Sequence, residues 1–316
     1  DSDAGEAAFQ AQASTAGTYG TFTLAADGTW SYSALNANPA VQALGTGDTL
    51  TETFTVRSVD GTTSTVVVTI NGTNDNAVIS SGTGSVTEDV AVSGGRIATG
   101  GTLTVTDSDA GEAAFQAQAS TAGTYGTFTL ATDGTWSYSA LNANPAIQAL
   151  GSGDTLTETF TVRSVDGTTS TVVVTINGTN DTAVISAGTG AVTEDVSVSA
   201  GRIATGGTLT VTDSDSGEAA FQPQASTAGT YGTFTLNAAG TWTYSALNAN
   251  PAIQALGSGD TLTETFTVRS VDGTTSTVVV TINGTNDGPV ALADAATTSE
   301  DTPLTLTPSA LLGNDS

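Results

Sequence analysis

Carboxylates are the residues of this chain whose types and spacing could do chemistry. The sequence has 31 Asp and Glu against five Arg, for a net charge of −26, and it has no Lys, His, Cys or Met. Between residues 76 and 181, five places near expected strand ends carry acids: Glu88-Asp89, the run from Asp107 to Glu112, Asp154 with Glu158, Asp166, and Asn180-Asp181. Oxygen ligands without His or Cys favour calcium over zinc. The alternative is that the acids only keep the chain soluble by mutual repulsion.

The run Asp107-Ser-Asp109-Ala-Gly matches the first positions of an EF-hand loop, in which alternate acids supply oxygens. A complete loop needs Glu at its twelfth position and a helix on each side. With Asp107 as the first position, the twelfth residue is Gln118, and strands are expected on both sides. The EF-hand interpretation therefore fails. Asp133 is also set aside as a ligand, because the third copy of this segment has Ala239 in its place.

The composition argues against several classes of function. A net charge of −26 disfavours nucleic acid and anionic lipid as partners, because both need basic patches. No segment approaches the roughly 20 apolar residues of a membrane span. An enzyme is disfavoured as well, because His and Cys are absent and no Gly-x-Ser-x-Gly elbow is evident. A glycosidase with paired carboxylates would need a cleft, of which the sequence gives no sign.

The chain is a tandem repeat. The segment that starts at Asp1 returns at Asp107 and, with one change, at Asp213, so the period is 106 residues. A unit of this size is typical of one independently folded domain. We therefore predict a truncated repeat over residues 1–75, complete repeats over 76–181 and 182–287, and the start of a further repeat over 288–316.

Each repeat is expected to be an antiparallel β-sandwich. In the complete unit, residues 102–106, 125–130, 136–138, 155–165 and 171–176 alternate or are rich in β-branched residues, and Asp-Gly pairs mark two hairpin turns. Residues 141–150 predict a short helical turn with Pro145 near its start. The inward phase of Phe128, Leu130, Trp136 and Tyr138 predicts the aromatic part of the core.

Glu158 is in phase with the core residues Phe160 and Val162. A buried carboxylate is costly without a counter-ion. We therefore expect Glu158 to lie at an exposed pole of the sandwich or to bind a cation; an ion pair with Arg163 or Arg96 is the structural alternative, but Arg residues are too few to neutralise the acids.

Several motifs together resemble the VCBS repeat, a cadherin-like domain of large bacterial adhesins with RTX-type secretion. They are residues 123–128 (Gly-Thr-Tyr-Gly-Thr-Phe), 133–138 (Asp-Gly-Thr-Trp-Ser-Tyr), 148–156 (Gln-Ala-Leu-Gly-Ser-Gly-Asp-Thr-Leu) and the Asp-Gly-Thr at 166–168. The tail motif Glu300-Asp-Thr-Pro-Leu, with Leu-Leu-Gly-Asn-Asp at 311–315, is similar to the start of another bacterial cadherin-like repeat. The resemblance implies seven-stranded sandwiches in an elongated array, with calcium at the junctions between neighbours.

The resemblance also implies a set of metal ligands. The linker pairs, the early Glu, the Asp-x-Asp pair and the Asp before Gly correspond to Asn74, Asp75, Asn180, Asp181 and Asp287; Glu88, Glu194 and Glu300; Asp107, Asp109, Asp213 and Asp215; and Asp166 and Asp272. The acidic motif before the long strand is matched only loosely by Asp48, Glu52, Asp154 and Glu158. We further expect Asp181, Glu194, Asp213, Asp215 and Asp272 to converge at the junction between the second and third units.

These features predict calcium-stiffened extender repeats of an adhesin that is secreted to the bacterial cell surface and acts in adhesion or biofilm formation. Its partners in this segment would be calcium ions and neighbouring repeats, and a distal domain outside the segment would bind the adhesion ligand. The alternative is that each repeat itself binds a carbohydrate or a protein. That alternative needs exposed aromatic rings, whereas Trp136 and Tyr138 are better explained as core residues.

Overall fold

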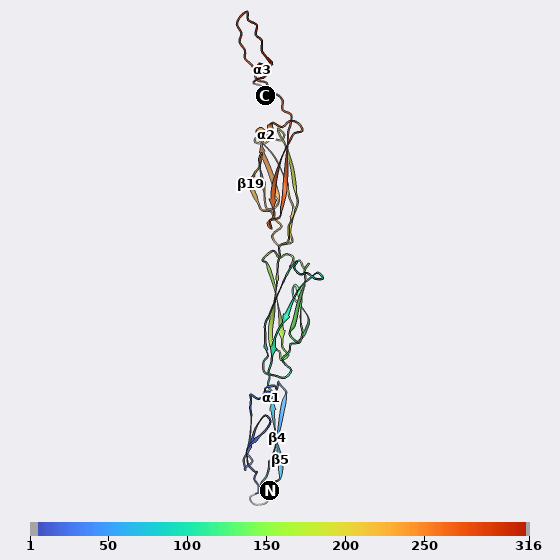
Figure 1. The fold of residues 1–316 in the computed structure, drawn as a ribbon, viewed down its shortest axis with the longest axis vertical. Coiled ribbons are helices and arrows are strands. Elements are labelled where there is room, and N and C mark those ends of the chain that lie inside the picture. Colours follow the sequence, from blue (N-terminus) through green and yellow to red (C-terminus); the bar gives the residue numbers. More distant parts are fainter. Residues whose placement is uncertain (1–5, 314–316) are drawn as a thin grey trace. The chain divides into compact units, whose positions relative to one another are not determined.

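The computed structural model of the chain describes residues 6–313. The first five residues of the motif that starts at Asp1, and the Asn-Asp end of the predicted tail motif, lie outside the described residues. The chain forms two compact units, Asp1–Thr179 and Asn180–Ser316. Each unit is built from strands that form two layers in each repeat, which can be followed in Figure 1.

The first unit contains the first repeat and the complete second repeat. The first repeat has β1 (Gln12–Ala16), β2 (Gly20–Leu24), β3 (Trp30–Ala34), α1 (Pro39–Gln42), β4 (Thr49–Arg57) and β5 (Thr63–Asn71). The second has β6 (Val78–Ile79), β7 (Gly82–Thr87), β8 (Arg96–Thr102), β9 (Val105–Thr106), β10 (Gln118–Ala122), β11 (Gly126–Leu130), β12 (Thr135–Leu141), β13 (Thr155–Arg163) and β14 (Thr169–Asn177).

The second unit contains the third repeat and the tail. Its elements are β15 (Val184–Ile185), β16 (Gly188–Thr193), β17 (Arg202–Thr208), β18 (Val211–Thr212), β19 (Gln224–Ala228), β20 (Gly232–Leu236), β21 (Thr241–Leu247), α2 (Pro251–Gln254), β22 (Thr261–Arg269), β23 (Thr275–Asn283) and α3 (Pro308–Leu311).

The second repeat is a sandwich of a four-stranded sheet, in the order β10-β11-β12-β8, and a three-stranded sheet, in the order β13-β14-β7. The predicted all-β, cadherin-like sandwich is therefore confirmed. The pairs are antiparallel except that β7 runs parallel to β14. This pairing brings residue 87, at the end of β7, next to residue 177, at the end of β14. Glu88, which follows β7, therefore lies next to the residues that follow β14.

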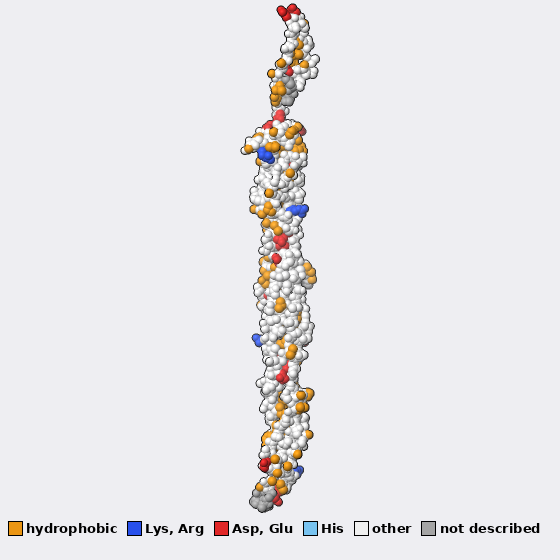
Figure 2. Space-filling model, turned by 90° about the vertical axis from the view of Figure 1, so that its left-hand side faces the viewer, with side chains coloured by type: hydrophobic (Ala, Val, Ile, Leu, Met, Phe, Trp, Pro, Cys, Tyr) orange, Lys and Arg blue, Asp and Glu red, His pale blue; other side chains and the backbone are white. Residues whose placement is uncertain are grey.

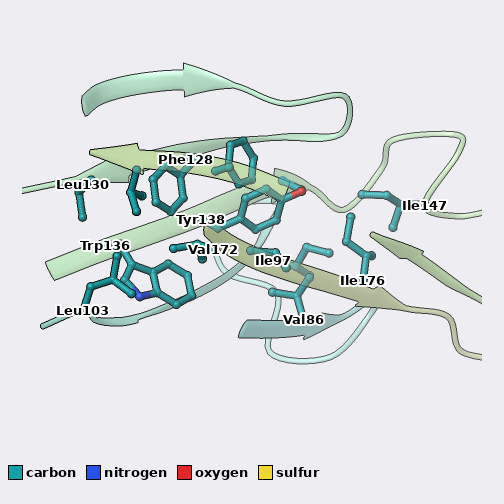
Figure 3. Packing of buried hydrophobic residues seen from close by; sticks show 14 of the residues in the cluster. Val86, Ile97, Leu103, Phe128, Leu130, Trp136, Tyr138, Ile147, Val172 and Ile176 are labelled. Atoms are coloured by element: carbon teal, nitrogen blue, oxygen red, sulfur yellow. The ribbon is translucent and has the colours of Figure 1, made fainter. Parts of the chain in front are cut away.

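The predicted aromatic core is confirmed. Phe128 pairs with Tyr138 and Leu130 with Trp136 across the hairpin of β11 and β12, and all four side chains are buried. The ring of Phe128 stacks on that of Phe160 from the other sheet, with 4.8 Å between centroids. Figure 3 shows this packing, with the Tyr138 hydroxyl at the edge of the aromatic group.

Trp136 needs the strand β7 to be buried. A Cβ atom on Gly84 of β7 would lie 2.6 Å from the Trp136 ring, so Gly at this position leaves room for the indole. The first copy starts at the position equivalent to Asp107 and so does not include the equivalents of β7 and β8. Its Trp30 is 49% exposed, whereas Trp136 is 3% exposed.

Two predicted elements differ from the structure. Residues 102–106 do not form one strand, because β8 ends at Thr102 and the N–H of Leu103 donates instead to the carbonyl of Gly134 in the hairpin turn, at 2.9 Å. The helical turn predicted for 141–150 is a single hydrogen-bonded turn in the second repeat, where the N–H of Gln148 donates to the carbonyl of Asn144 at 3.0 Å, whereas the short helices α1 and α2 form at the equivalent place in the other two copies.

Candidate metal site

A loop of acids follows β9 in the second repeat. The Oδ1 of Asp107 accepts a hydrogen bond from the N–H of Asp109, at 2.9 Å. The Oδ2 of Asp109 accepts one from the N–H of the linker residue Asp75, at 2.8 Å. Asp109 is only 2% exposed. The structure thus brings together three predicted ligands, from the linker and from the Asp-x-Asp pair.

This loop touches the first repeat. The N–H of Ala110 donates to the carbonyl of Ala43, at 3.1 Å. A Cβ atom on Gly45 would lie 3.0 Å from the Oε1 of Glu112 and 3.6 Å from the side chain of Asp109. Gly45 and Asp48 belong to one turn, in which the N–H of Asp48 donates to the carbonyl of Gly45. Acids of two successive repeats therefore lie close together within the first unit.

Three carboxylate oxygens at this place are buried and have no hydrogen-bond partner. They are Oδ2 of Asp107, Oδ1 of Asp109 and Oε2 of Glu112. A buried polar atom without a partner carries a cost of about 1–3 kcal/mol, and more when it is charged. Burial raises the pKa of Glu112, and the charges of Asp109, Asp107, Asp166 and Asp48 raise it further.

These observations fit a hard cation. All the donors are oxygens, as calcium prefers, and the unpartnered oxygens lie within a group of like charges. Among residues 6–313, no group of three or more acidic side chains is already arranged to hold a metal ion. The acids are thus gathered at one place without being in coordinating positions.

Asp166 lies at the same end of the second repeat, where its side chain is hydrogen-bonded to the first residues of that repeat. Its Oδ2 accepts a hydrogen bond from the N–H of Ala77, at 3.0 Å, and the hydroxyls of Ser164 and Thr168 also donate to the carboxylate. Burial opposes ionisation of Asp166, but these hydrogen bonds outweigh it and lower the pKa of the carboxyl. The side chain is therefore held as a carboxylate.

The second unit repeats this arrangement within itself. The N–H of Asp181 donates to the Oδ2 of Asp215, at 2.9 Å, and the N–H of Asp215 donates to the Oδ1 of Asp213, at 3.0 Å. The Oδ2 of Asp213 is buried without a hydrogen-bond partner. Burial opposes ionisation of Asp272, but bonds from Ser270, Thr274 and the N–H of Ala183 lower its pKa to about 2. Asp181, Asp213 and Asp215 thus lie together, and Asp272 holds the start of the same repeat through Ala183.

Glu194 does not join them, so this part of the predicted convergence is wrong. It follows β16, which runs parallel to β23, and its Oε1 accepts a hydrogen bond from the N–H of Thr285, at 2.7 Å. Asp272 precedes β23 and Thr285 follows it, so nine residues of strand, about 30 Å, separate the two. Glu88 has the same position in the second repeat, where its Oε1 accepts from the N–H of Thr179.

The remaining linker residues have mainly structural contacts. The side-chain amides of Asn74 and Asn180 donate to the carbonyls of Asp75 and Asp181, each at 2.9 Å. Asp287 is exposed and interacts with Asp195 at the Glu194 end of the third repeat. Glu300 is exposed on the tail. The structure does not bring Glu300 to any of the acidic groups described above.

The two Glu residues of the loosely matched motif are not at the metal site. Glu158 is 6% exposed. Its Oε1 accepts from the N–H of Tyr125, at 3.0 Å, and its Oε2 from the Tyr138 hydroxyl. Glu52 has equivalent contacts with Tyr19 and Tyr32. The expectation that Glu158 needs an exposed pole or a cation is therefore wrong, because a tyrosine of the facing sheet supplies the donor.

The Asp residues of that motif behave differently. Asp48 and Asp154 are both exposed and lie in equivalent turns. The N–H of Asp48 donates to the carbonyl of Gly45, and the N–H of Asp154 donates to the carbonyl of Gly151. Asp48 lies close enough to Glu112 to raise its pKa. Glu112 itself is absent from the predicted ligands, although the Gly-Glu pair after Asp-x-Asp-x recurs in all three copies and could have pointed to it.

The acids form separate groups and not one continuous patch, and Figure 2 shows this on the face it presents.

A family model for the bacterial cadherin-like domain matches residues 1–72, 74–178 and 180–284. The chain belongs to the family of bacterial cadherin-like domains. Tandem domains of this kind are extracellular, adhesion-related repeats, and cadherin-like domains are structural modules rather than enzymes.

The chain is also similar to solved structures of cadherin ectodomains. The chain is 14% identical to a structure of protocadherin gammaB7 EC3-6, with a TM-score of 0.45, covering 95% of this chain and 71% of that one. It is 16% identical to the protocadherin gammaB4 extracellular domain, with a TM-score of 0.44, covering 93% of this chain and 46% of that one. A comparison with curated proteins gave no match. Within the described residues, no helix is both long and apolar enough to span a membrane.

Proposed function

We propose that these bacterial cadherin-like domains are calcium-stiffened extender repeats of a secreted bacterial surface adhesin. The observation that carries the proposal is the acidic group at the first repeat boundary, where buried oxygens of Asp107, Asp109 and Glu112 lack hydrogen-bond partners. Asp48 of the preceding repeat lies close to the same group. A cation bound here contacts two repeats and the linker residue Asp75 that joins them.

Calcium is the cation that suits this group. Calcium accepts six to eight oxygen ligands in irregular geometry, whereas magnesium demands a near-ideal octahedron and gives up its water reluctantly. Extracellular calcium is in the millimolar range that weak oxygen-rich sites require. Since the ion binds the folded state and not the unfolded chain, calcium outside the cell drives folding of a chain that is secreted unfolded.

The exposed aromatic rings that the alternative function needs are not found in the complete repeats. Trp136, Trp242, Tyr138 and Tyr244 are all buried in the sandwich core. A groove between β10 and β13 has a volume of about 470 Å³ and is lined mainly by Thr. Phe160 also lines this groove, but it is only 5% exposed and offers no open face on which a sugar could stack, so we prefer the extender function.

Thermal unfolding tests the proposal. Calcium at about 100 times its Kd adds about 2.7 kcal/mol to the free energy of unfolding, which corresponds to a rise in melting temperature of roughly 10 °C or more for a domain of this size. We expect this rise with calcium, a smaller one with magnesium, and its reversal by a chelator. An unchanged melting temperature in all three conditions would contradict the proposal.

A further inference from the structure

Glu112 is the acid of the second repeat whose carboxylate comes closest to Gly45 of the first repeat. A Cβ atom on Gly45 would be 3.0 Å from its Oε1, and its Oε2 is buried with no hydrogen-bond partner. Asp109, which is 2% exposed, points an equally unpartnered Oδ1 into the same group. Two independent side chains therefore present oxygens to one place, and neither oxygen has a hydrogen-bond partner among residues 6–313.

The other acids of this group are held by their own repeat or by the linker. Asp107 accepts a hydrogen bond from the N–H of Asp109, Asp109 from that of Asp75, and Asp166 from that of Ala77. These bonds remain whether or not the first repeat is in place. Glu112 is different, because its carboxylate is the side-chain group closest to Gly45 of the first repeat, at 3.0 Å from a Cβ there against 3.6 Å for Asp109, and because it lies near the charge of Asp48.

We propose that Glu112 is a calcium ligand and that it makes calcium binding depend on the preceding repeat. This inference rests on the proposed function and names a ligand that the predicted set lacks. The ion is held by the aspartates of the second repeat, and Glu112 closes the site against the turn of the first. Binding and stiffening of the boundary are thereby coupled.

Gly45 supports this assignment from the other side of the boundary. It is buried, and it leaves the room that the Glu112 carboxylate occupies. Gly257 has the same repeat position in the third copy, but it is exposed, and a Cβ there would meet only Asp260, at 3.4 Å. A small residue is thus required by packing at Gly45 and not at Gly257.

The test compares Glu112→Gln with Glu6→Gln in the full chain. Glu6 has the same repeat position but lies beside Asp60, at the end of β4 away from Asp48. Calcium titration calorimetry should show about a 10-fold or larger loss of affinity at one site for Glu112→Gln and no loss for Glu6→Gln. In chelator, Glu112→Gln should melt at the same temperature as the wild type or higher, since it removes one of several like charges.

Spin labels give a readout of the coupling. The chain has no Cys, so Thr65→Cys and Thr171→Cys, which are exposed on β5 and β14, can be labelled selectively. In calcium we expect a narrow distance distribution for the wild type and a broad one in the Glu112→Gln background. Gly45→Ala should weaken calcium binding as well, although it removes no acid.

The outcomes separate this inference from the proposed function. If the wild type binds calcium and stiffens, but Glu112→Gln does the same with equal affinity, then Glu112 is not a ligand and the proposed function stands. If Glu112→Gln lowers the melting temperature equally in calcium and in chelator, its role is only in packing and the inference fails. If the wild type itself does not respond to calcium, both fail.

Discussion

Two groups of buried carboxylates in the second repeat are held in opposite ways. Glu158 lies between the sheets, and each of its oxygens accepts a hydrogen bond, from the Tyr138 hydroxyl and from the N–H of Tyr125. At the repeat boundary, Asp107 and Asp109 each keep one buried oxygen without a partner. Burial of an acid is therefore not a sign of a metal ligand, whereas an unpartnered buried oxygen among like charges is.

The difference follows from what surrounds each group. Burial and then the hydrogen bond to Glu158 raise the pKa of Tyr138 far above its usual value, so the phenol keeps its proton and donates a hydrogen bond to the carboxylate. Gly123 leaves room for this contact, because a Cβ there would overlap the Glu158 carboxylate. At the boundary, the charged neighbours of Glu112 are other acids, and its Oε2 has no hydrogen-bond partner within the described residues.

The largest expected effect separates the two groups by their dependence on calcium. In the double variant Asp107→Asn and Asp109→Asn, calcium should no longer raise the free energy of unfolding of the second repeat, a rise of about 2.7 kcal/mol at 100 times the Kd in the wild type. Glu158→Gln should lower stability with and without calcium and leave the gain intact. Calorimetric melting of both variants in calcium and in chelator measures this. An equal loss of the calcium gain in both variants would erase the distinction between the groups.

The second effect removes the donor of the hydrogen-bonded group. Tyr138→Phe leaves the Oε2 of Glu158 buried without a partner, which should cost about 1–3 kcal/mol, independently of calcium. The matched control is Tyr32→Phe in the first copy, where the hydroxyl makes the same contact with Glu52, at 2.5 Å, but the ring is partly exposed. Urea unfolding should show the smaller loss for Tyr32→Phe. Equal losses would mean that solvent access does not decide the cost.

The sequence predicts the parts of this comparison that depend on local pattern. Alternation within residues 125–138 correctly predicts the hairpin and its aromatic core, and alternation within 155–165 predicts the inward phase of Glu158, because a strand sends alternate side chains to opposite faces. It cannot predict the Tyr138 hydroxyl as the partner of Glu158, because that contact joins residues of two different sheets.

The metal site shows the same limit at longer range. Asp107, Asp109 and the linker Asp75 are close along the fold because the linker runs directly into the second repeat, and the predicted set includes them. Glu194 is misplaced because the parallel pairing of β16 with β23 leaves no local pattern in the sequence. Glu112 is missed because the recurring Gly-Glu pair marks its position but does not show its contact with Gly45 of the preceding repeat, which suggests its role.

The pH dependence of stability should have opposite signs in the two kinds of environment. The pKa of Glu112 is raised, so in chelator its contribution should stabilise the fold as the pH falls from neutral through that pKa. The pKa of Asp166 is lowered, so its contribution is present above about pH 4 and is lost as the pH falls further.

Unfolding curves between pH 7 and pH 2, with and without calcium, measure this dependence. In chelator, stability should rise on mild acidification and then fall. This rise in stability should be absent in calcium, which compensates the negative charge of Glu112, and in the Glu112→Gln variant, which lacks that charge. A monotonic loss of stability in chelator from neutral pH downwards would show that the boundary acids do not repel one another.

The smallest effect concerns an acid that belongs to neither group. Asp133 is exposed at the tip of the β11–β12 hairpin, and its Oδ1 accepts a hydrogen bond from the N–H of Thr135, at 2.9 Å. In the third copy Ala239 replaces it, and the side chain of Asn237 accepts the equivalent bond, from the N–H of Thr241. The turn thus needs an acceptor and not a charge.

Asp133→Ala should therefore lower the melting temperature by only about 1–3 °C, by the same amount in calcium and in chelator. Asp133→Asn keeps an oxygen for the Thr135 N–H and should melt like the wild type. The rescuing change is Ala131→Asn, which reproduces Asn237 of the third copy and should recover the lost stability in the Asp133→Ala background. A loss of melting temperature for Asp133→Ala that depends on calcium would place a calcium ligand at the hairpin tip. It would also contradict the separation between acids that have only a structural role and acids that are proposed to bind calcium.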